Sequence, residues 1–183
     1  MAHRRCLAGF VALLVVTGCA KPGGRVFRFA EAAEIPVAVT ERDQLAALLA
    51  GYAQRNGLYF RDTSPRAQRT TNGRQTLALA MERTLTTGRP WAEVAVSAIG
   101  NGPALITFID PPLAGVAEDS QAARAKLLAE LTARWPAMLP VPVLPDGAIP
   151  RQEDLRHTPQ GLKIDPASAA QYHLPADSPL VAR

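Results

Sequence analysis

The sequence is poor in cysteine, with only Cys6 and Cys19 among its 183 residues. Two cysteines exclude a disulfide scaffold. Aromatic residues are also scarce, at 5%, and the formal net charge is only +4. With no cluster of Lys and Arg on a predicted helix, the chain has no footprint for nucleic-acid binding. What is present, 48% hydrophobic and 20% charged residues, is typical of a globular domain and excludes a fibrous or fully disordered chain.

The apolar stretch at the front of the chain is too short to span a bilayer. It runs from Cys6 to about Val16 and follows Arg4 and Arg5, whereas a spanning helix needs about 20 apolar residues. A basic pair, a short apolar core and then small residues form the three-part layout of a secretory signal. A buried helix is one alternative, but the stretch has no amphipathic face. A twin-arginine export signal is another, although His3 and Cys6 match its flanks poorly.

The end of this stretch, Val16-Thr17-Gly18-Cys19, resembles the lipobox of bacterial lipoproteins, with Val in place of the more usual Leu. The resemblance implies that a diacylglycerol is joined to the sulfur of Cys19, that the signal is cut just before it, and that the new amino group is acylated. Ordinary cleavage near Gly18, leaving a free thiol, is the alternative. Under the lipid interpretation Cys6 is discarded and Cys19 is consumed, so no cysteine remains for a disulfide, a metal or a nucleophile.

The resemblance also predicts how the chain is divided and where it is located. Residues 1–18 are the signal peptide, and residues 19–25 are a lipidated tether rich in Gly and Pro. Two or three acyl chains hold a protein on a bilayer essentially permanently, because burial contributes about 0.8 kcal/mol per CH₂. In this class the residue after the lipidated Cys biases sorting, and Ala20 favours the outer membrane. We therefore expect an outer-membrane lipoprotein whose domain faces the periplasm.

Residues 26–145 are predicted to form one α+β domain, a two-layer sandwich in which two helices cover one face of an antiparallel sheet of three to five strands. The first helix begins at Thr40 as N-cap and ends at Asn56-Gly57, and Leu45, Leu48, Leu49 and Tyr52 repeat at helical spacing. The second runs from Asp119 or Ser120 to about Trp135. Strands or extended segments are expected at 26–30, 35–39, 58–61, 75–83, 93–99, 104–110 and 141–144.

Two segments show no persistent period. Residues 62–74 are polar and are predicted to form a loop between strands. Residues 140–183 hold 8 of the 16 prolines, so we expect residues 146–183 to be an irregular, Pro-rich C-terminal tail. Local pairing at 161–164 is the one regular element anticipated there.

Four arginines lie in or beside the predicted loop, with one acidic residue among them: Arg61, Arg66, Arg69 and Arg74. Guanidinium groups match phosphate groups well, so this set could contact an anionic bilayer or lipopolysaccharide. The alternative is a loop that is simply solvated.

Two tryptophans are candidates for a ligand groove or a docking face, because aromatic side chains dominate interface energetics. Trp135 fits the inward stripe of its helix and is better explained as core. Trp91, beside Arg89 and Pro90 at a strand entry, stays open between core packing and docking.

Catalytic signatures are scarce. The chain has no G-x-S-x-G motif and no P-loop. His157 and His173 both fall in the Pro-rich tail, without the spacing of a helical zinc site. Glu93 and Asp110 could form a carboxylate pair, but an outward-facing strand charge and a turn residue are the simpler interpretations. Ser97 lies in an apolar run without a glycine elbow.

The sequence therefore predicts an envelope lipoprotein with a non-enzymatic binding or accessory domain, no metal and no cofactor. Its expected partners are the membrane, through Cys19, and another envelope protein. Two alternatives stay open. One is a lipid-anchored hydrolase acting on cell-wall or lipid material, which would bring Glu93 or Asp110 together with a histidine. The other is an accessory or protective lipoprotein of a secretion system.

Overall fold

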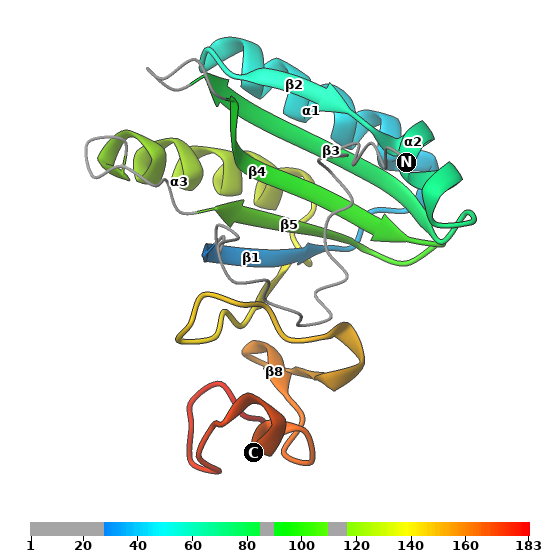
Figure 1. Ribbon diagram of the computed structural model, residues 1–183. Helices are drawn as coiled ribbons and strands as arrows, with labels where there is room; N and C mark the ends of the chain where they lie inside the picture. The colour runs from blue at the N-terminus through cyan, green and yellow to red at the C-terminus, as the bar shows by residue number, and fades with distance from the viewer. Residues whose placement is uncertain (1–27, 85–89, 110–116) are drawn as a thin grey trace, which may run out of the picture.

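The computed structural model describes residues 28–84, 90–109 and 117–183, with side chains left out at 90, 91 and 117–120. These residues form a six-stranded antiparallel sheet in the order β2-β3-β4-β5-β1-β6 and a separate two-stranded hairpin, β7-β8 (Figure 1). The strands are β1 (Phe29–Ile35), β2 (Tyr59–Asp62), β3 (Gln75–Thr84), β4 (Pro90–Ile99), β5 (Ala104–Ile109), β6 (Leu139–Val141), β7 (Leu155–Thr158) and β8 (Gly161–Ile164).

The predicted α+β class is confirmed, although the sheet has six strands instead of three to five. In place of the two short strands expected at 26–30 and 35–39, the described residues hold a single strand, β1, which lies mostly between them and ends at Ile35 just before Pro36; residues 26 and 27 lie outside the described residues. β1 pairs with β5 on one side and with β6 on the other. The central strands β3, β4 and β5 lie where hydrophobic alternation predicts them.

One face of the sheet is covered by two helices, α1 (Arg42–Arg55) and α3 (Ala117–Arg134), which lie side by side behind it in Figure 1. Alternate residues of β3, β4 and β5 point toward these helices. Together they form the main core, whose largest side chains are almost completely buried. Those side chains include Leu45, Leu49, Leu79, Met81, Ile106, Phe108, Leu127, Leu131 and Trp135. Trp135, 5% exposed, is a core residue as expected.

The start of α1 differs from the prediction. A 3-10 turn, η1 (Val39–Glu41), precedes the helix, so Thr40 lies within that turn and is not the N-cap. The carboxylate of Glu41 instead accepts a hydrogen bond from the backbone N–H of Ala38, at 3.2 Å. A short hydroxyl side chain signals a helix start, but here the carboxylate one residue later binds the free N–H group.

Arg42 explains why the helix begins where it does. Its side chain is buried, and its guanidinium donates to the hydroxyl of Thr76 at 2.7 Å and to the carbonyls of Gly100 and Gly102 at 2.9 and 3.0 Å. A buried guanidinium is costly unless its donors are satisfied, and these three bonds satisfy both terminal nitrogens, while Nε is buried without a partner among the described residues. The first residue of α1 therefore fixes the helix to the β4–β5 turn.

The segment expected to be a loop at 62–74 contains a short helix, α2 (Ser64–Thr70), so that prediction is wrong. α2 begins where β2 ends and continues along the free edge of β3. Ala78 pairs with it through both backbone groups, donating to the hydroxyl of Ser64 at 2.9 Å and accepting from the N–H of Thr63 at 2.8 Å. Gln68 donates to the carbonyl of Thr76 at 3.2 Å. α2 thereby protects an edge that strand β2 is too short to cover.

The C-terminal segment carries more regular structure than the expected irregular tail. It contains the β7-β8 hairpin and two 3-10 turns, η3 (Gln152–Asp154) and η4 (Ala169–Tyr172). Its apolar residues pack on the second sheet face, where Ile149, Leu155 and Leu162 contact a cluster around Ala32 and Val141. Residues 143–181, here called the C-terminal cover, therefore close part of the face opposite the helices, around β1 and β6. In Figure 1 most of this segment lies below β1.

Candidate functional site

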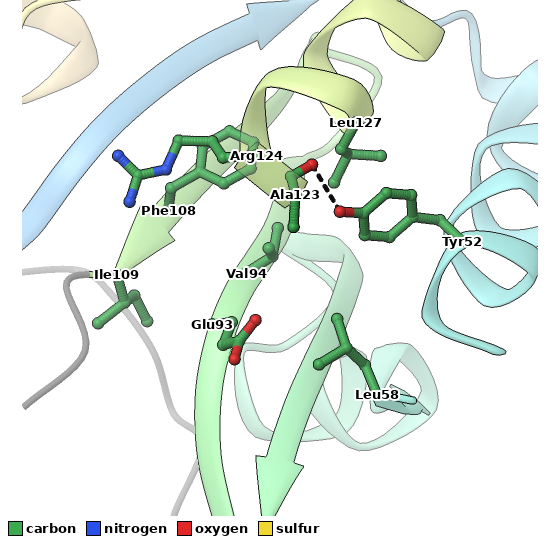
Figure 2. Close-up of a pocket in the computed structure, with 9 residues that line it drawn as sticks. All are labelled: Tyr52, Leu58, Glu93, Val94, Phe108, Ile109, Ala123, Arg124 and Leu127. Atoms are coloured by element: carbon green, nitrogen blue, oxygen red, sulfur yellow. Dashed lines mark hydrogen bonds between the residues drawn. The ribbon is translucent and has the colours of Figure 1, made fainter. Parts of the chain in front are cut away.

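A small pocket lies between α1, α3 and the end of the sheet at which β1 begins (Figure 2). Its volume is about 20 Å³, which is room for one water molecule. Nine residues from both helices and from the sheet and its connections line it: Tyr52, Leu58, Glu93, Val94, Phe108, Ile109, Ala123, Arg124 and Leu127. The guanidinium of Arg124 lies over the ring of Phe108, with its central carbon 5.6 Å from the ring centre.

Glu93 enters this pocket because of a β-bulge. Met81 pairs with Val94, whereas the next residue of β3, Glu82, pairs with Ala92, so Glu93 has no partner across the ladder. The expected outward-facing charge is instead 7% exposed. Its carboxylate forms an ion pair with Arg83. A bulge cannot be read from alternation, which is why the prediction of an exposed side chain was wrong.

Tyr52 supplies the other polar group of the pocket. Its hydroxyl donates a hydrogen bond to the carbonyl of Ala123 at 2.6 Å, as drawn in Figure 2. Burial, with a smaller contribution from the negative charge of Glu93, raises the pKa of Tyr52 above its ordinary value. The phenol is therefore neutral at physiological pH, and its hydroxyl joins α1 to α3.

The arrangement expected of a hydrolase does not occur in the described residues. Neither His157 nor His173 lines the pocket of Glu93, and both are exposed on the C-terminal cover. Asp110, the other acid of the expected carboxylate pair, lies outside the described residues. Across the described ranges, no three or more His, Cys, Asp and Glu residues gather as metal ligands would.

The four predicted arginines lie along one edge of the sheet, on β2, on α2 and in the turn after α2. We call this set, Arg61, Arg66, Arg69 and Arg74, the basic strip. Arg61 is partly neutralised, because its guanidinium lies 3.0 Å from the carboxylate of Glu82.

The other three arginines of the basic strip are exposed. Within the part of the chain that the structure describes, their guanidinium groups make no ion pair or side-chain hydrogen bond. Elsewhere in that part of the chain, Arg55, Arg134 and Arg156 each pair with a carboxylate. Arg66, Arg69 and Arg74 are therefore open to an anionic partner, and Asp62 is the exposed acid beside them.

The side chains of the two other candidate residues, Trp91 and Cys19, lie outside the described part of the chain. Trp91 is in β4, opposite Arg83, but its side chain lies outside the described residues. Cys19 also lies outside them. None of the helices in the described ranges has the length and apolar character needed to cross a membrane.

A polar cluster in the C-terminal cover was missed by the sequence analysis. Asp154, 9% exposed, accepts hydrogen bonds from the hydroxyl of Ser168 at 2.8 Å and from that of Tyr172. The bond from Tyr172 is the main cause that lowers the pKa of Asp154 below its ordinary value, against the opposing effect of burial. Because 14 and 18 residues separate the partners, no local motif could reveal them.

With the geometry in place, the chain can be compared with known proteins. No family model, curated protein or solved structure matches it. Function must therefore be argued from the residues themselves.

Proposed function

We propose that this chain is an envelope lipoprotein, anchored in the outer membrane by a lipid on Cys19, with a periplasmic domain that binds a neighbouring envelope component. The observation that carries the proposal is the lipobox-like Val16-Thr17-Gly18-Cys19 after a short apolar core. A lipid on the first residue of the processed chain would restrict the domain to the membrane surface.

The described core is compatible with cleavage before Cys19. The buried apolar residues of the described part lie between Phe29 and Val181. Cleavage before Cys19 would leave all of them in the processed protein.

The chemistry of the described polar groups favours binding over catalysis. Glu93 is paired with Arg83, and the hydroxyl of Tyr52 is held by a backbone carbonyl. The pocket that they share has room for about one water molecule. A substrate would find little space there, whereas the exposed basic strip is accessible to a large partner.

The anchor is tested by mass spectrometry of the processed protein in a bacterial host, together with labelling by a palmitate analogue. We expect the N-terminal residue to be acylated Cys19 and the label to fractionate with outer membranes. Cys19→Ala should abolish both labelling and cleavage at this site. Cys6→Ala is the matched control, because it removes the other cysteine and should leave lipidation unchanged. An unacylated terminus, at Gly18 or elsewhere, contradicts the proposal.

A further inference from the structure

The basic strip runs the length of one sheet edge. β2 forms this edge, and in Figure 1 it leads directly into α2 at the far end. Arg61 lies on the strand, Arg66 and Arg69 on α2, and Arg74 immediately before β3. Edge strands are commonly protected by charge, but along the part of β3 that β2 does not reach this role is performed by the backbone and hydroxyl contacts of α2 with β3. The exposed guanidinium groups of Arg66 and Arg69 on α2 are not needed for it.

Two exposed apolar side chains accompany the arginines. Tyr59, at the start of β2, is 64% exposed, and the guanidinium of Arg61 lies 5.9 Å from its ring centre. Ile99 is 59% exposed and lies across from Gln75, the neighbour of Arg74. Arginine beside exposed tyrosine and aliphatic groups is the combination that favours the interface of an anionic bilayer, where phosphates meet the acyl chains.

The reach of the chain allows this edge to contact the anchoring membrane. β1, which Phe29 begins, and β2 are four places apart in the sheet, which is roughly 19 Å at the usual spacing of strands. α2 lies about 20 Å further along the strand direction, judged from the rise of a seven-residue strand. Ten residue steps separate Cys19 from Phe29 and span at most about 33–36 Å. Both ends of the strip lie within that distance.

We propose that the basic strip docks on anionic phospholipid headgroups of the membrane that holds the lipid anchor, so that the β2 edge lies along the bilayer. This inference rests on the proposed function. The guanidinium groups of Arg66, Arg69 and Arg74 bind headgroup phosphates, and Tyr59 and Ile99 enter the interface beside them. The lipid then confines the protein to the surface, and the strip sets which edge of the domain faces it.

The test uses the chain from residue 20 onward, which lacks the lipid and keeps the whole described core. Sedimentation with vesicles of phosphatidylcholine containing about 30 mol% phosphatidylglycerol is compared with pure phosphatidylcholine. The unmodified chain should bind the anionic vesicles and not the neutral ones. Raising the salt from about 0.05 M to about 0.5 M should release it.

A charge-matched pair of variants decides whether the strip itself is responsible. Arg66→Gln with Arg69→Gln should lower the partition coefficient about 25-fold, at about fivefold for each arginine near the surface. Arg151→Gln with Arg183→Gln removes the same charge from two exposed positions, one on the C-terminal cover and one just after it, and should change the partition coefficient less than about twofold. Equal losses in both variants, or no preference for anionic vesicles, overturn the proposal.

The outcome is independent of the anchor. The vesicle assay contains no lipidated Cys19, so failure of lipidation in cells leaves its result unchanged. If Cys19 is acylated but the strip does not bind vesicles, the proposed function stands and the membrane is not the partner of the strip. Circular dichroism and the thermal midpoint confirm that each variant is folded, as expected for exposed side chains.

Discussion

The two faces of the sheet are covered in different ways. α1 and α3 lay aliphatic side chains over one face and form one continuous core. The C-terminal cover closes part of the other face with smaller, separate clusters around Phe29 and Ile109 and around Ala32 and Val141. A cavity of about 60 Å³ remains beneath it, lined by residues that include Glu34 and Leu162.

The two covers are stabilised in different ways. An amphipathic helix buries a stripe of large side chains against the sheet, so burial of apolar surface accounts for most of its stabilisation. The C-terminal cover buries less, and it relies on particular contacts. One is the close approach of Gly161 to Pro140 of β6, and two lie within the cover itself, the polar cluster of Asp154 and the bridge between Ile164 and Val181.

The largest effect is expected in the helix-covered core. Leu131 of α3 is completely buried there. Leu131→Ala should reduce the free energy of unfolding by about 2–5 kcal/mol, because the lost transfer energy adds to the cost of a cavity. Urea denaturation followed by circular dichroism measures it. A loss below about 1 kcal/mol would mean that α3 does not carry the stability of this face.

The helix-covered face is also what the sequence could predict. Leu77, Leu79 and Met81 alternate in β3, and the apolar stripe of the first helix repeats every three or four residues, so both periods locate buried faces. The C-terminal cover gives no such signal. Ile149 and Leu162 reach the sheet from a hairpin and connecting segments at irregular spacing, and burial of this kind depends on the path of the chain.

The candidate sites were predictable to different degrees. The arginines of the basic strip stand out in the sequence as a cluster, and the structure places them along one edge. Their setting was not foreseen, since α2 is too short to show a period, although Pro65 in its first turn was an available start signal. The pocket of Glu93 depends on a bulge, and the cluster of Asp154 depends on long-range contacts.

An intermediate effect is expected where the C-terminal cover meets β6. Gly161 has a φ of +114°, and a Cβ at this position would lie 2.7 Å from Cγ of Pro140. Gly161→Ala should lower the free energy of unfolding by about 3 kcal/mol, because backbone strain adds to the clash. Gly73→Ala is the control: its φ is +77° and nothing lies within 4 Å, so about 1 kcal/mol is expected. If denaturation showed equal losses of unfolding free energy for the two variants, the contact between Gly161 of β8 and Pro140 of β6 would not be a close one.

The smallest effect, and the most specific to the C-terminal cover, concerns Asp154. Its pKa is lowered in the folded state, chiefly by the hydrogen bond from Tyr172. The stabilisation is therefore present above the unfolded pKa of about 3.9 and is lost as the pH falls through the folded value. Asp154→Asn should cost about 1–2 kcal/mol near neutral pH, and the difference from the unmodified protein should shrink as the solution is acidified below about pH 4.

Thermal unfolding at several pH values, with hydrogen exchange at β7 and β8, tests whether the loss is confined to the C-terminal cover. The matched variant is Glu130→Gln, which breaks the exposed pair of Arg55 and Glu130, 2.8 Å apart, between α1 and α3. An exposed pair contributes about 0.2–1 kcal/mol, and apolar burial already holds those helices. If Glu130→Gln proved as costly as Asp154→Asn, polar contacts would matter equally on both faces, and the contrast between the two covers would have to be given up.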